Sequence, residues 1–421
     1  MGRRDDPLAL QAYRLGTGLL EPLAPVLLHQ RARRGKEDPA RIGERLGRPS
    51  AARPEGPLVW LHGASVGESL SLLPLIEGLR TARPELNVLV TSGTVTSAEL
   101  IARRAPAGVI HQYIPVDAPS AAGRFLDHWR PNLGVFVESE VWPNLITQSK
   151  ARGAKLALVS ARLSDASLAR WAKRPAAARA LFRSFDLVLA QSDAVARGLR
   201  DLGARDSGRL NLKLAGAPLS VDLAELAQLR AAAEDRPVLL AASTHPGEDE
   251  IVLDAFAKIS AYGRLVIVPR HPERGAAIAE AARQRGFEVA RRTEQPFGPA
   301  HVYVADTLGE MGLWLSLATA ALIGGSLLPG PGGHNPIEPA QLGCPIITGP
   351  HVENWLSVYA ELIGASAAVV ATDTLDLTAA FSEVLLQPAV ARARAERARA
   401  IVAGGTSGLD GAVAALLKLI P

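Results

Sequence analysis

Cysteine is almost absent from this sequence, and several classes of protein are excluded with it. Cys344 is the single cysteine among 421 residues. One thiol cannot form a disulfide within the chain, and it cannot supply a metal site that needs several cysteine ligands. We therefore expect the protein to work in a reducing compartment such as the cytosol.

Aromatic residues and dense basic stripes are also scarce. Phe, Trp and Tyr together make up 5% of the chain, and the formal net charge is only +4. Nucleic-acid-binding surfaces usually combine clustered Lys and Arg with interleaved aromatic residues. Because no such stripe occurs, we expect no nucleic-acid partner, whereas the mild excess of cations suits a partner that carries phosphates or carboxylates.

Two common nucleotide and metal motifs are missing as well. The chain has no Walker pattern (Gly, four residues, Gly-Lys-Ser/Thr), which disfavours ATP hydrolysis. It has no Asp-x-Asp pair and no two histidines at helical spacing. We therefore predict neither a bound metal nor any other cofactor.

The apolar N-terminal stretch, residues 7–29, is interrupted by charges and prolines, namely Arg14, Glu21, Pro22 and Pro25. A helix that spans a membrane tolerates few charges. The sequence also lacks the small-residue cleavage site of a signal peptide, so we do not expect one. A basic cluster follows at Arg31, Arg33, Arg34 and Lys36. We interpret residues 1–35 as a membrane-associated segment lying on an anionic leaflet. A first helix packed on its own domain is an equal alternative, and a full span is a less favoured one.

What the sequence does contain is a repeated alternation of short apolar runs with helical periods. The expected strands cover residues 58–61, 88–91, 111–116, 133–137, 155–159 and 187–190, and then 238–241, 265–268, 302–305, 320–323 and 346–347. Such alternation predicts an α/β protein with parallel sheets covered by helices.

The alternation stops once, near residues 207–236, which divides the chain into two Rossmann-like halves. The predicted parts are an N-terminal domain over 36–212, a linker over 213–236, a C-terminal domain over 237–400, and a last helix over 401–421 that could close back across the first domain.

The stretch 58–68 (LVWLHGASVGE) reads as a strand, a tight turn and the start of a helix. It puts Ser65, Gly67 and Glu68 at the carboxyl edge of a parallel sheet, where open α/β folds bind ligands. Taken alone, Glu68 is either a catalytic carboxylate or a residue that stabilises the helix dipole.

A second acidic pair, Glu138 and Glu140, follows the strand predicted at 133–137 and lies next to Trp142. Residues two apart share a face only in an extended chain, so we expect only one of the two carboxylates to reach the cleft. Trp142 could contact a sugar ring or pack in the core.

In the second half, a Gly/Pro-rich loop leads from the strand at 320–323 to Asn335, a good N-cap, with Pro336 and Glu338 after it. Glycines let backbone amides approach an anion at a helix start. The loop is therefore a candidate phosphate cradle, and Glu338 a candidate acceptor for ribose hydroxyls. The alternative is a capped helix after a flexible loop.

Two further clusters follow strands of the same half. Arg270 can hold a phosphate or carboxylate with its planar guanidinium, and Ser243 and Thr244 offer hydroxyls and amides. His245 and His271 either touch the phosphate or are polar surface residues.

Five motifs in this order together resemble the 3-deoxy-D-manno-octulosonic acid (Kdo) transferases of lipopolysaccharide and lipid A assembly. They are HGASVGE at 62–68, ESEVWPN at 138–144, STHPGE at 243–248, PRHPER at 269–274, and the glycine-rich loop with HNPIEP at 324–339. The likeness covers nearly the whole chain, with one small departure at Ala242, where a glycine is expected.

The resemblance implies a GT-B glycosyltransferase fold whose two Rossmann-like domains face each other across a cleft. It implies that CMP-Kdo is the donor, that a primary hydroxyl of the lipid A precursor (lipid IVA) is the acceptor, and that transfer inverts the anomeric centre. Glu68 would be the general base, with no metal required. The enzyme would work at the cytoplasmic face of the inner membrane.

The resemblance also assigns the remaining site residues. Ser65 and Gly67 would aim the base, and Glu138 and Glu140 would support the acceptor side or domain closure. The nucleotide-sugar would be bound by Ser243, Thr244, Arg270, His271, Gly325, Ser326, Gly333, Asn335 and Glu338.

Two other functions stay open at this stage. One is another two-domain enzyme that uses a nucleotide sugar, such as a UDP-GlcNAc epimerase or transferase, which would prefer UDP to CMP. The other is a peripheral membrane lipid-binding protein without catalysis, which would keep its function without Glu68.

Overall fold

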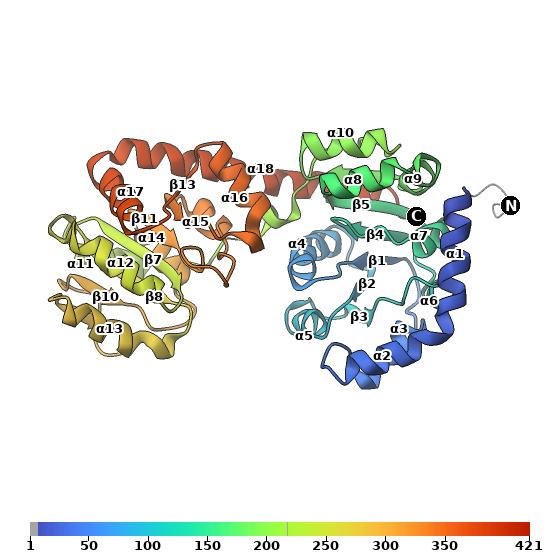
Figure 1. Ribbon diagram of the computed structural model, residues 1–421, viewed down its shortest axis with the longest axis horizontal. Helices are drawn as coiled ribbons and strands as arrows, with labels where there is room; N and C mark the ends of the chain where they lie inside the picture. Colours follow the sequence, from blue (N-terminus) through green and yellow to red (C-terminus); the bar gives the residue numbers. More distant parts are fainter. Residues whose placement is uncertain (1–6, 217) are drawn as a thin grey trace. The chain divides into compact units, whose positions relative to one another are not determined.

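The computed structural model describes residues 7–216 and 218–421, apart from the side chains of residues 406 and 407. The chain divides into two compact units, Met1–Gly216 together with Gly405–Pro421, and Ala217–Gly404. Each unit contains a parallel sheet with helices on both faces (Figure 1). The predicted α/β class with two Rossmann-like domains is therefore confirmed.

The sheet of the first unit has six parallel strands in the order β3-β2-β1-β4-β5-β6. The strands are β1 (Leu58–His62), β2 (Asn87–Ser92), β3 (Ile110–Tyr113), β4 (Leu133–Val137), β5 (Lys155–Ala161) and β6 (Leu187–Ala190). Every residue of β1 and β4 is buried, as expected for central strands covered on both faces. Because β1 lies between β2 and β4, the winding reverses there, and the carboxyl ends of β1 and β4 form the topological switch point.

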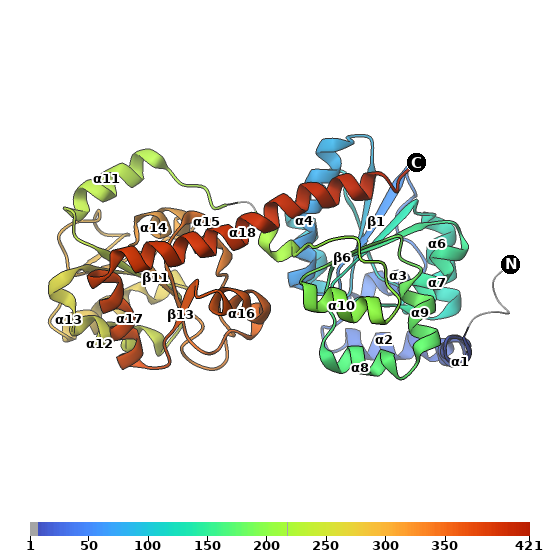
Figure 2. The ribbon, with the colours of Figure 1, turned by 90° about the horizontal axis from the view of Figure 1, so that it is seen from above.

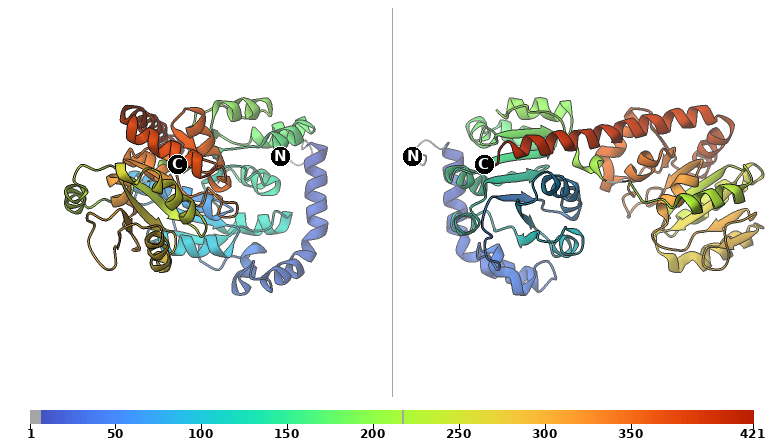
Figure 3. Two further views of the ribbon diagram at one scale, coloured as in Figure 1. Left: turned by 60° about the vertical axis from the view of Figure 1, so that its left-hand side comes forward. Right: turned by 180° about the vertical axis from the view of Figure 1, so that it is seen from behind.

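The helices of the first unit cover both faces of this sheet. They are α1 (Leu8–Leu20), α2 (Ala24–Ala32), α3 (Ile42–Arg45), α4 (Val66–Ala82), α5 (Val95–Arg104), α6 (Pro119–Trp129), α7 (Pro143–Ala151), α8 (Asp165–Ala172), α9 (Pro175–Phe182) and α10 (Asp193–Asp201), with short 3-10 turns η1 (Glu21–Leu23), η2 (Pro39–Arg41) and η3 (Leu212–Ala215). Helix α1 packs against α6, α7 and α9, and the blue helices α1 and α2 lie on the outside of the unit (Figure 3).

The sheet of the second unit has seven parallel strands in the order β13-β12-β11-β7-β8-β10-β9. They are β7 (Val238–Thr244), β8 (Arg264–Pro269), β9 (Val289–Arg291), β10 (Val302–Val304), β11 (Ala320–Ile323), β12 (Ile346–Thr348) and β13 (Ala368–Val370). The winding reverses between β7 and β11, so the loops after these two strands share the ligand-binding edge.

The helices of the second unit are α11 (Leu223–Ala233), α12 (Glu248–Ala257), α13 (Gly275–Gln284), α14 (Met311–Leu317), α15 (Ile337–Leu342), α16 (Leu356–Gly364), α17 (Thr374–Leu386) and the first part of α18 (Pro388–Leu417), with 3-10 turns η4 (Ser260–Tyr262), η5 (Pro272–Arg274) and η6 (Glu353–Trp355). Residues 388–404 of α18, the long red helix in Figure 2, belong to this unit and residues 405–417 to the first.

Helix α18 is the one described helix that is long and apolar enough to cross a bilayer by length and composition alone. Several of its apolar side chains, however, are buried in the cores of the units. Ala391 is buried in the core of the second unit, and Val413 and Leu416 are buried in that of the first. Val413 lies so close to α4 that a Cβ added to Gly78 would be 2.8 Å from its Cγ2 atom.

The predicted linker over 213–236 is too long. Residues 223–233 form helix α11, whose Leu226 and Leu229 are buried and which packs against α14. The sequence pattern did not predict this helix. It did not predict the edge strands β9 and β13 either, because strands of three residues carry little hydrophobic periodicity.

Candidate functional site

Glu68 stands in the first turn of α4, directly after β1. Ser65 is the N-cap, and its Oγ accepts a hydrogen bond from the Glu68 amide at 3.3 Å. In return, Glu68 Oε2 accepts from the amides of Ala64 at 2.6 Å and Ser65 at 3.3 Å. This capping box fixes the carboxylate at the sheet edge, while Oε1 has no hydrogen-bond partner among the described residues.

Gly63 makes this close turn possible. A Cβ at position 63 would lie 3.1 Å from both the carbonyl carbon and the Cβ of Glu68. A larger residue would therefore push the first turn of α4 away from β1, and the carboxylate with it.

The surroundings of Glu68 favour its protonated form. Burial raises the pKa of the Glu68 carboxyl above that of a free glutamate, and the negative charge of Glu140 raises it further. The two amide hydrogen bonds oppose the shift without cancelling it. A carboxylate with a raised pKa is a stronger base at the moment it is ionised, which suits proton abstraction from a hydroxyl.

Glu140 lies after β4, and its surroundings favour the ionised form of its carboxyl, whereas those of Glu68 favour the protonated form. Its Oε2 accepts from Trp142 Nε1 at 2.6 Å and lies 3.2 Å from His62 Nε2. Burial alone would raise the pKa of Glu140, but the hydrogen bond and charge of His62, with the Trp142 indole, hold it below the usual value. Two neighbouring carboxylates with pKa values pushed apart are the arrangement expected of a base and a charged supporting group.

His62, the last residue of β1, connects this pair to the core. It is completely buried, and its Nδ1 lies 3.1 Å from the carbonyl oxygen of Thr91, which can only accept a hydrogen. Nδ1 also lies 3.0 Å from the Thr91 hydroxyl, and the opposite ring nitrogen, Nε2, faces Glu140. His62 belongs to the motif at 62–68, but its position in the sequence indicated no role for it.

Glu138 points elsewhere. It has a left-handed backbone with φ of 51°, and its Oε1 lies 2.9 Å from Nζ of Lys213, an ion pair without the alignment of a good hydrogen bond. The two carboxylates of this loop thus have different partners. Lys213, from η3, was missed because it lies in a stretch without periodicity that was assigned to the linker.

In the second unit, the loop after β11 is organised around a buried carboxylate. Glu248 is fully buried and accepts four backbone hydrogen bonds. The donors are the amides of His245 at 2.9 Å, Gly325 at 2.7 Å, Ser326 at 2.9 Å and Leu327 at 2.9 Å. Glu248 therefore joins the loop after β7 to the loop after β11.

This arrangement corrects part of the predicted phosphate cradle. The amides of Gly325 and Ser326 already bind Glu248, and the buried Ser326 hydroxyl donates to Ile323 O at 2.5 Å and accepts from the Gly349 amide at 2.8 Å. The amide of Gly333 donates to Gly325 O at 2.6 Å. Gly325, Ser326 and Gly333 therefore shape the loop. Their amides and the Ser326 hydroxyl form hydrogen bonds within the protein and are not free for a phosphate.

Asn335 and Glu338 keep polar groups available at the same edge. Asn335 Oδ1 accepts from the Ile337 amide at 3.0 Å, but the N-cap of α15 is Pro336, so the helix starts one residue later than predicted. Its Nδ2 donates to Glu338 Oε1 at 3.0 Å. Burial raises the pKa of Glu338, and its Oε2 has no hydrogen-bond partner among the described residues.

A cationic and histidine-rich cluster lies at the carboxyl ends of β7, β8 and β11. Arg270 is exposed, and its guanidinium has no hydrogen bond or ion pair with the described residues. His245 and His334 are stacked, with their Nε2 atoms 2.9 Å apart, and the rings of His245 and His271 are 6.2 Å apart. Burial and the charges of His245 and Arg270 lower the pKa of His334 to about 4. A guanidinium without an acidic partner, as in this cluster, attracts anions.

The remaining predicted residues frame this cluster. Ser243 has a left-handed backbone with φ of 59° at the end of β7. Thr244 is completely buried, so its hydroxyl is not exposed to a ligand, and its carbonyl accepts from the Arg270 amide at 3.0 Å and from Arg274 at 2.9 Å. Within the described residues, no group of three His, Cys, Asp or Glu side chains is placed to hold a metal ion.

Comparison with known proteins agrees with these motifs. The family model for 3-deoxy-D-manno-octulosonic-acid transferase (kdotransferase) matches residues 40–215. A 3-deoxy-D-manno-octulosonic acid transferase of Bordetella pertussis is 34% identical over 416 residues, which cover 92% of this chain and 94% of the relative. The chain belongs to the Kdo transferase family. A probable mitochondrial Kdo transferase of Arabidopsis thaliana is 36% identical over 82% of this chain and 81% of its own length.

Solved structures support the GT-B fold of this Kdo transferase family member. MurG of Acinetobacter baumannii has a TM-score of 0.54 at 12% identity, covering 82% of this chain and 95% of that one. UDP-GlcNAc 2-epimerase of Neisseria meningitidis also has a TM-score of 0.54 at 12% identity, covering 86% and 99%. At this identity the likeness concerns the fold alone.

Proposed function

We propose that the protein transfers Kdo from CMP-Kdo to a primary hydroxyl of the lipid A precursor lipid IVA, with inversion at the anomeric carbon and with Glu68 as the general base. Membership of the Kdo transferase family supports the sugar and the reaction class. The observation that carries the mechanism is the capped carboxylate of Glu68, whose pKa is raised and whose Oε1 is available at the switch point of the first unit.

In this mechanism Glu68 takes the proton from the acceptor hydroxyl while that oxygen attacks the anomeric carbon of Kdo. The bond from the anomeric carbon to the phosphate oxygen breaks, and CMP leaves with the electron pair. Inversion requires one base on the face opposite the leaving group, and we propose Glu68 for that role. Glu140, held ionised by His62 and Trp142, keeps the Glu68 pKa raised.

For the donor, we propose that Arg270 binds the phosphate or the Kdo carboxylate and that His245, His271 and His334 complete an anion-binding surface. Glu338 Oε2 would accept from the ribose hydroxyls, oriented by Asn335. Because this surface is already cationic and CMP is a good leaving group, we propose that no metal is needed.

We also propose that α1 and α2 lie on the cytoplasmic surface of the inner membrane. Leu8, Leu15 and Leu19 on α1 are 83%, 66% and 81% exposed. Helix α1 has 13 residues and is followed by a 3-10 turn, so at 1.5 Å per residue it is too short for the roughly 30 Å hydrocarbon core. An interfacial helix followed by the basic residues 31–36 fits this length, whereas a span does not.

The proposal is tested by incubating the protein with CMP-Kdo and lipid IVA and measuring the product by mass spectrometry. We expect a product heavier than the acceptor by one or more Kdo residues, and tighter binding of CMP than of UDP. A folded protein that binds CMP but forms no such product would refute the proposal, and preferential binding of UDP would favour another nucleotide-sugar enzyme.

A further inference from the structure

A groove beside Glu140 in the first unit has no part in the proton transfer described above. Its volume is about 570 Å³, within the range of sites that bind small molecules. Its walls come from α1, from the loop that follows β4, and from the region of α8 and α9. The larger side chains that line it are Leu10, Tyr13, Val141, Trp142 and Trp171.

The polar atoms of Tyr13 and Trp142, two of the aromatic residues in the lining, are hydrogen-bonded within the protein. The Tyr13 hydroxyl donates to Asp117 Oδ2 at 3.0 Å, and the Trp142 indole N–H donates to Glu140 Oε2 at 2.6 Å. These two rings therefore contribute their apolar surfaces to the walls. A hydrocarbon chain fits these apolar surfaces, because it removes them from water without leaving a polar group of its own unpaired.

Small residues keep the groove open. Ala9 and Ala12 on α1 and Ala177 on α9 contribute only methyl groups to the lining. Ala12 is exposed, so a larger side chain there would enter the groove without disturbing the core.

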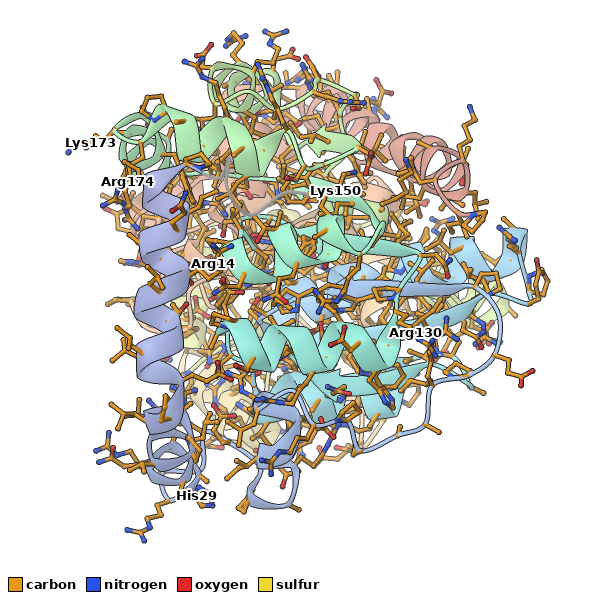
Figure 4. The ribbon with its side chains drawn as sticks, turned by 90° about the vertical axis from the view of Figure 1, so that its right-hand side faces the viewer. Arg14, His29, Arg130, Lys150, Lys173 and Arg174 are labelled. Carbon is orange, nitrogen blue, oxygen red and sulfur yellow. The ribbon has the colours of Figure 1, made fainter. Side chains whose placement is uncertain are left out.

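One cation lies at the same groove. Arg174, in the turn before α9, is exposed, and its guanidinium forms no ion pair or hydrogen bond with the described residues. Figure 4 shows it beside the first turns of α1, next to Lys173, while Arg14 lies further along α1 and His29 towards its far end. A guanidinium in this position suits a phosphate attached to an apolar chain.

The groove also connects the two regions on which the proposed function depends. It is lined by Glu140, whose charge acts on Glu68, and by α1, whose exposed leucines Leu8, Leu15 and Leu19 form the proposed membrane face. A lipid held here would have its chain beside the bilayer and its polar part at the acceptor side of the site.

We propose that this groove, given the proposed function, binds one acyl chain of the lipid acceptor, with Arg174 binding a phosphate of the same molecule. The occupant is the substrate and not a bulk phospholipid, because Glu140, one carboxylate of the candidate active site, lines the groove.

The test uses the full chain with Ala12→Trp, which fills the groove, and with Ala172→Trp as a matched control at an exposed alanine outside the lining. Two acceptors are compared, lipid IVA and its fully deacylated sugar phosphate. We expect Ala12→Trp to raise KM for lipid IVA at least tenfold and to leave the turnover of the deacylated acceptor within twofold of wild type. We expect Ala172→Trp to change neither.

A second pair of variants tests the cation. Arg174→Ala should raise KM for both phosphorylated acceptors severalfold, whereas Lys173→Ala, an adjacent cation outside the groove, should not. Equal losses on both acceptors with Ala12→Trp, or no loss on either, would overturn the acyl-chain site. Weaker binding of Ala12→Trp to phosphatidylglycerol vesicles, matching the loss on lipid IVA, would assign the groove to bulk phospholipid and overturn it too. If wild type transferred Kdo to neither acceptor, the proposed function itself would fail.

Discussion

Replacing Glu248 with glutamine should loosen the donor-side loops of the second unit without a large change of shape. Glu248 accepts four backbone hydrogen bonds of 2.7 to 2.9 Å through its two carboxylate oxygens. A glutamine keeps one oxygen but presents an amide NH₂ to the other donors, so two buried backbone N–H groups lose their acceptor. Each such loss costs about 1–3 kcal/mol, so we expect a destabilisation of roughly 2–6 kcal/mol.

The loss is measured most directly by hydrogen exchange of the peptide that contains the amides of residues 325–327. A change of 1.4 kcal/mol corresponds to a factor of ten, so exchange there should be at least tenfold faster in Glu248→Gln than in wild type. Glu250→Gln, an exposed position in the same turn of α12, serves as the control and should exchange like wild type. Unchanged protection in Glu248→Gln would refute the account of how this carboxylate holds the loop.

Two further predictions concern the pH dependence and the packing of the sites. Glu140→Gln removes a negative charge that raises the pKa of Glu68. Because the base must be ionised to act, the acidic limb of the kcat/KM profile should move to lower pH. An acidic limb at the same pH as in wild type would show that Glu140 does not act on the titrating group. Gly349→Ala places a Cβ 2.0 Å from the carbonyl oxygen of Ser326, so it should lower the melting temperature of the second unit and weaken CMP binding in a titration. As a control, Gly364→Ala, whose Cβ would have no atom within 4 Å, should change neither. Wild-type CMP affinity in Gly349→Ala would contradict the packing argument.

The sequence predicted much of the fold because the signals were local. Residues 133–137, 187–190 and 320–323 were assigned to strands with the bounds that the structure has, since each is a short apolar run bounded by polar residues or glycine. Helix α11 was missed because Gly216 and Pro218 near it suggested a linker, and because its burial depends on α14, far away in the sequence.

The candidate site was less predictable, because hydrogen-bond partners depend on tertiary contacts. Glycines in the loop after β11 suggested amides free for a phosphate, yet a carboxylate from a different loop, Glu248, binds them. The pairs His62–Glu140 and Lys213–Glu138 join residues more than seventy positions apart, and no local pattern indicates them. The position of Glu68 at the start of a helix could be predicted because the strand, the turn and the helix start lie within a few consecutive residues.

The central claim is that Glu68 is the base for Kdo transfer, and a single-turnover experiment tests it most directly. Lipid IVA and CMP-Kdo would be mixed with excess enzyme, and product formation would be followed by mass spectrometry for wild type and Glu68→Gln. Since general base catalysis contributes about 10²- to 10⁴-fold, we predict a loss of at least a hundredfold in the rate for Glu68→Gln, with CMP affinity unchanged. A rate within tenfold of wild type would contradict the account.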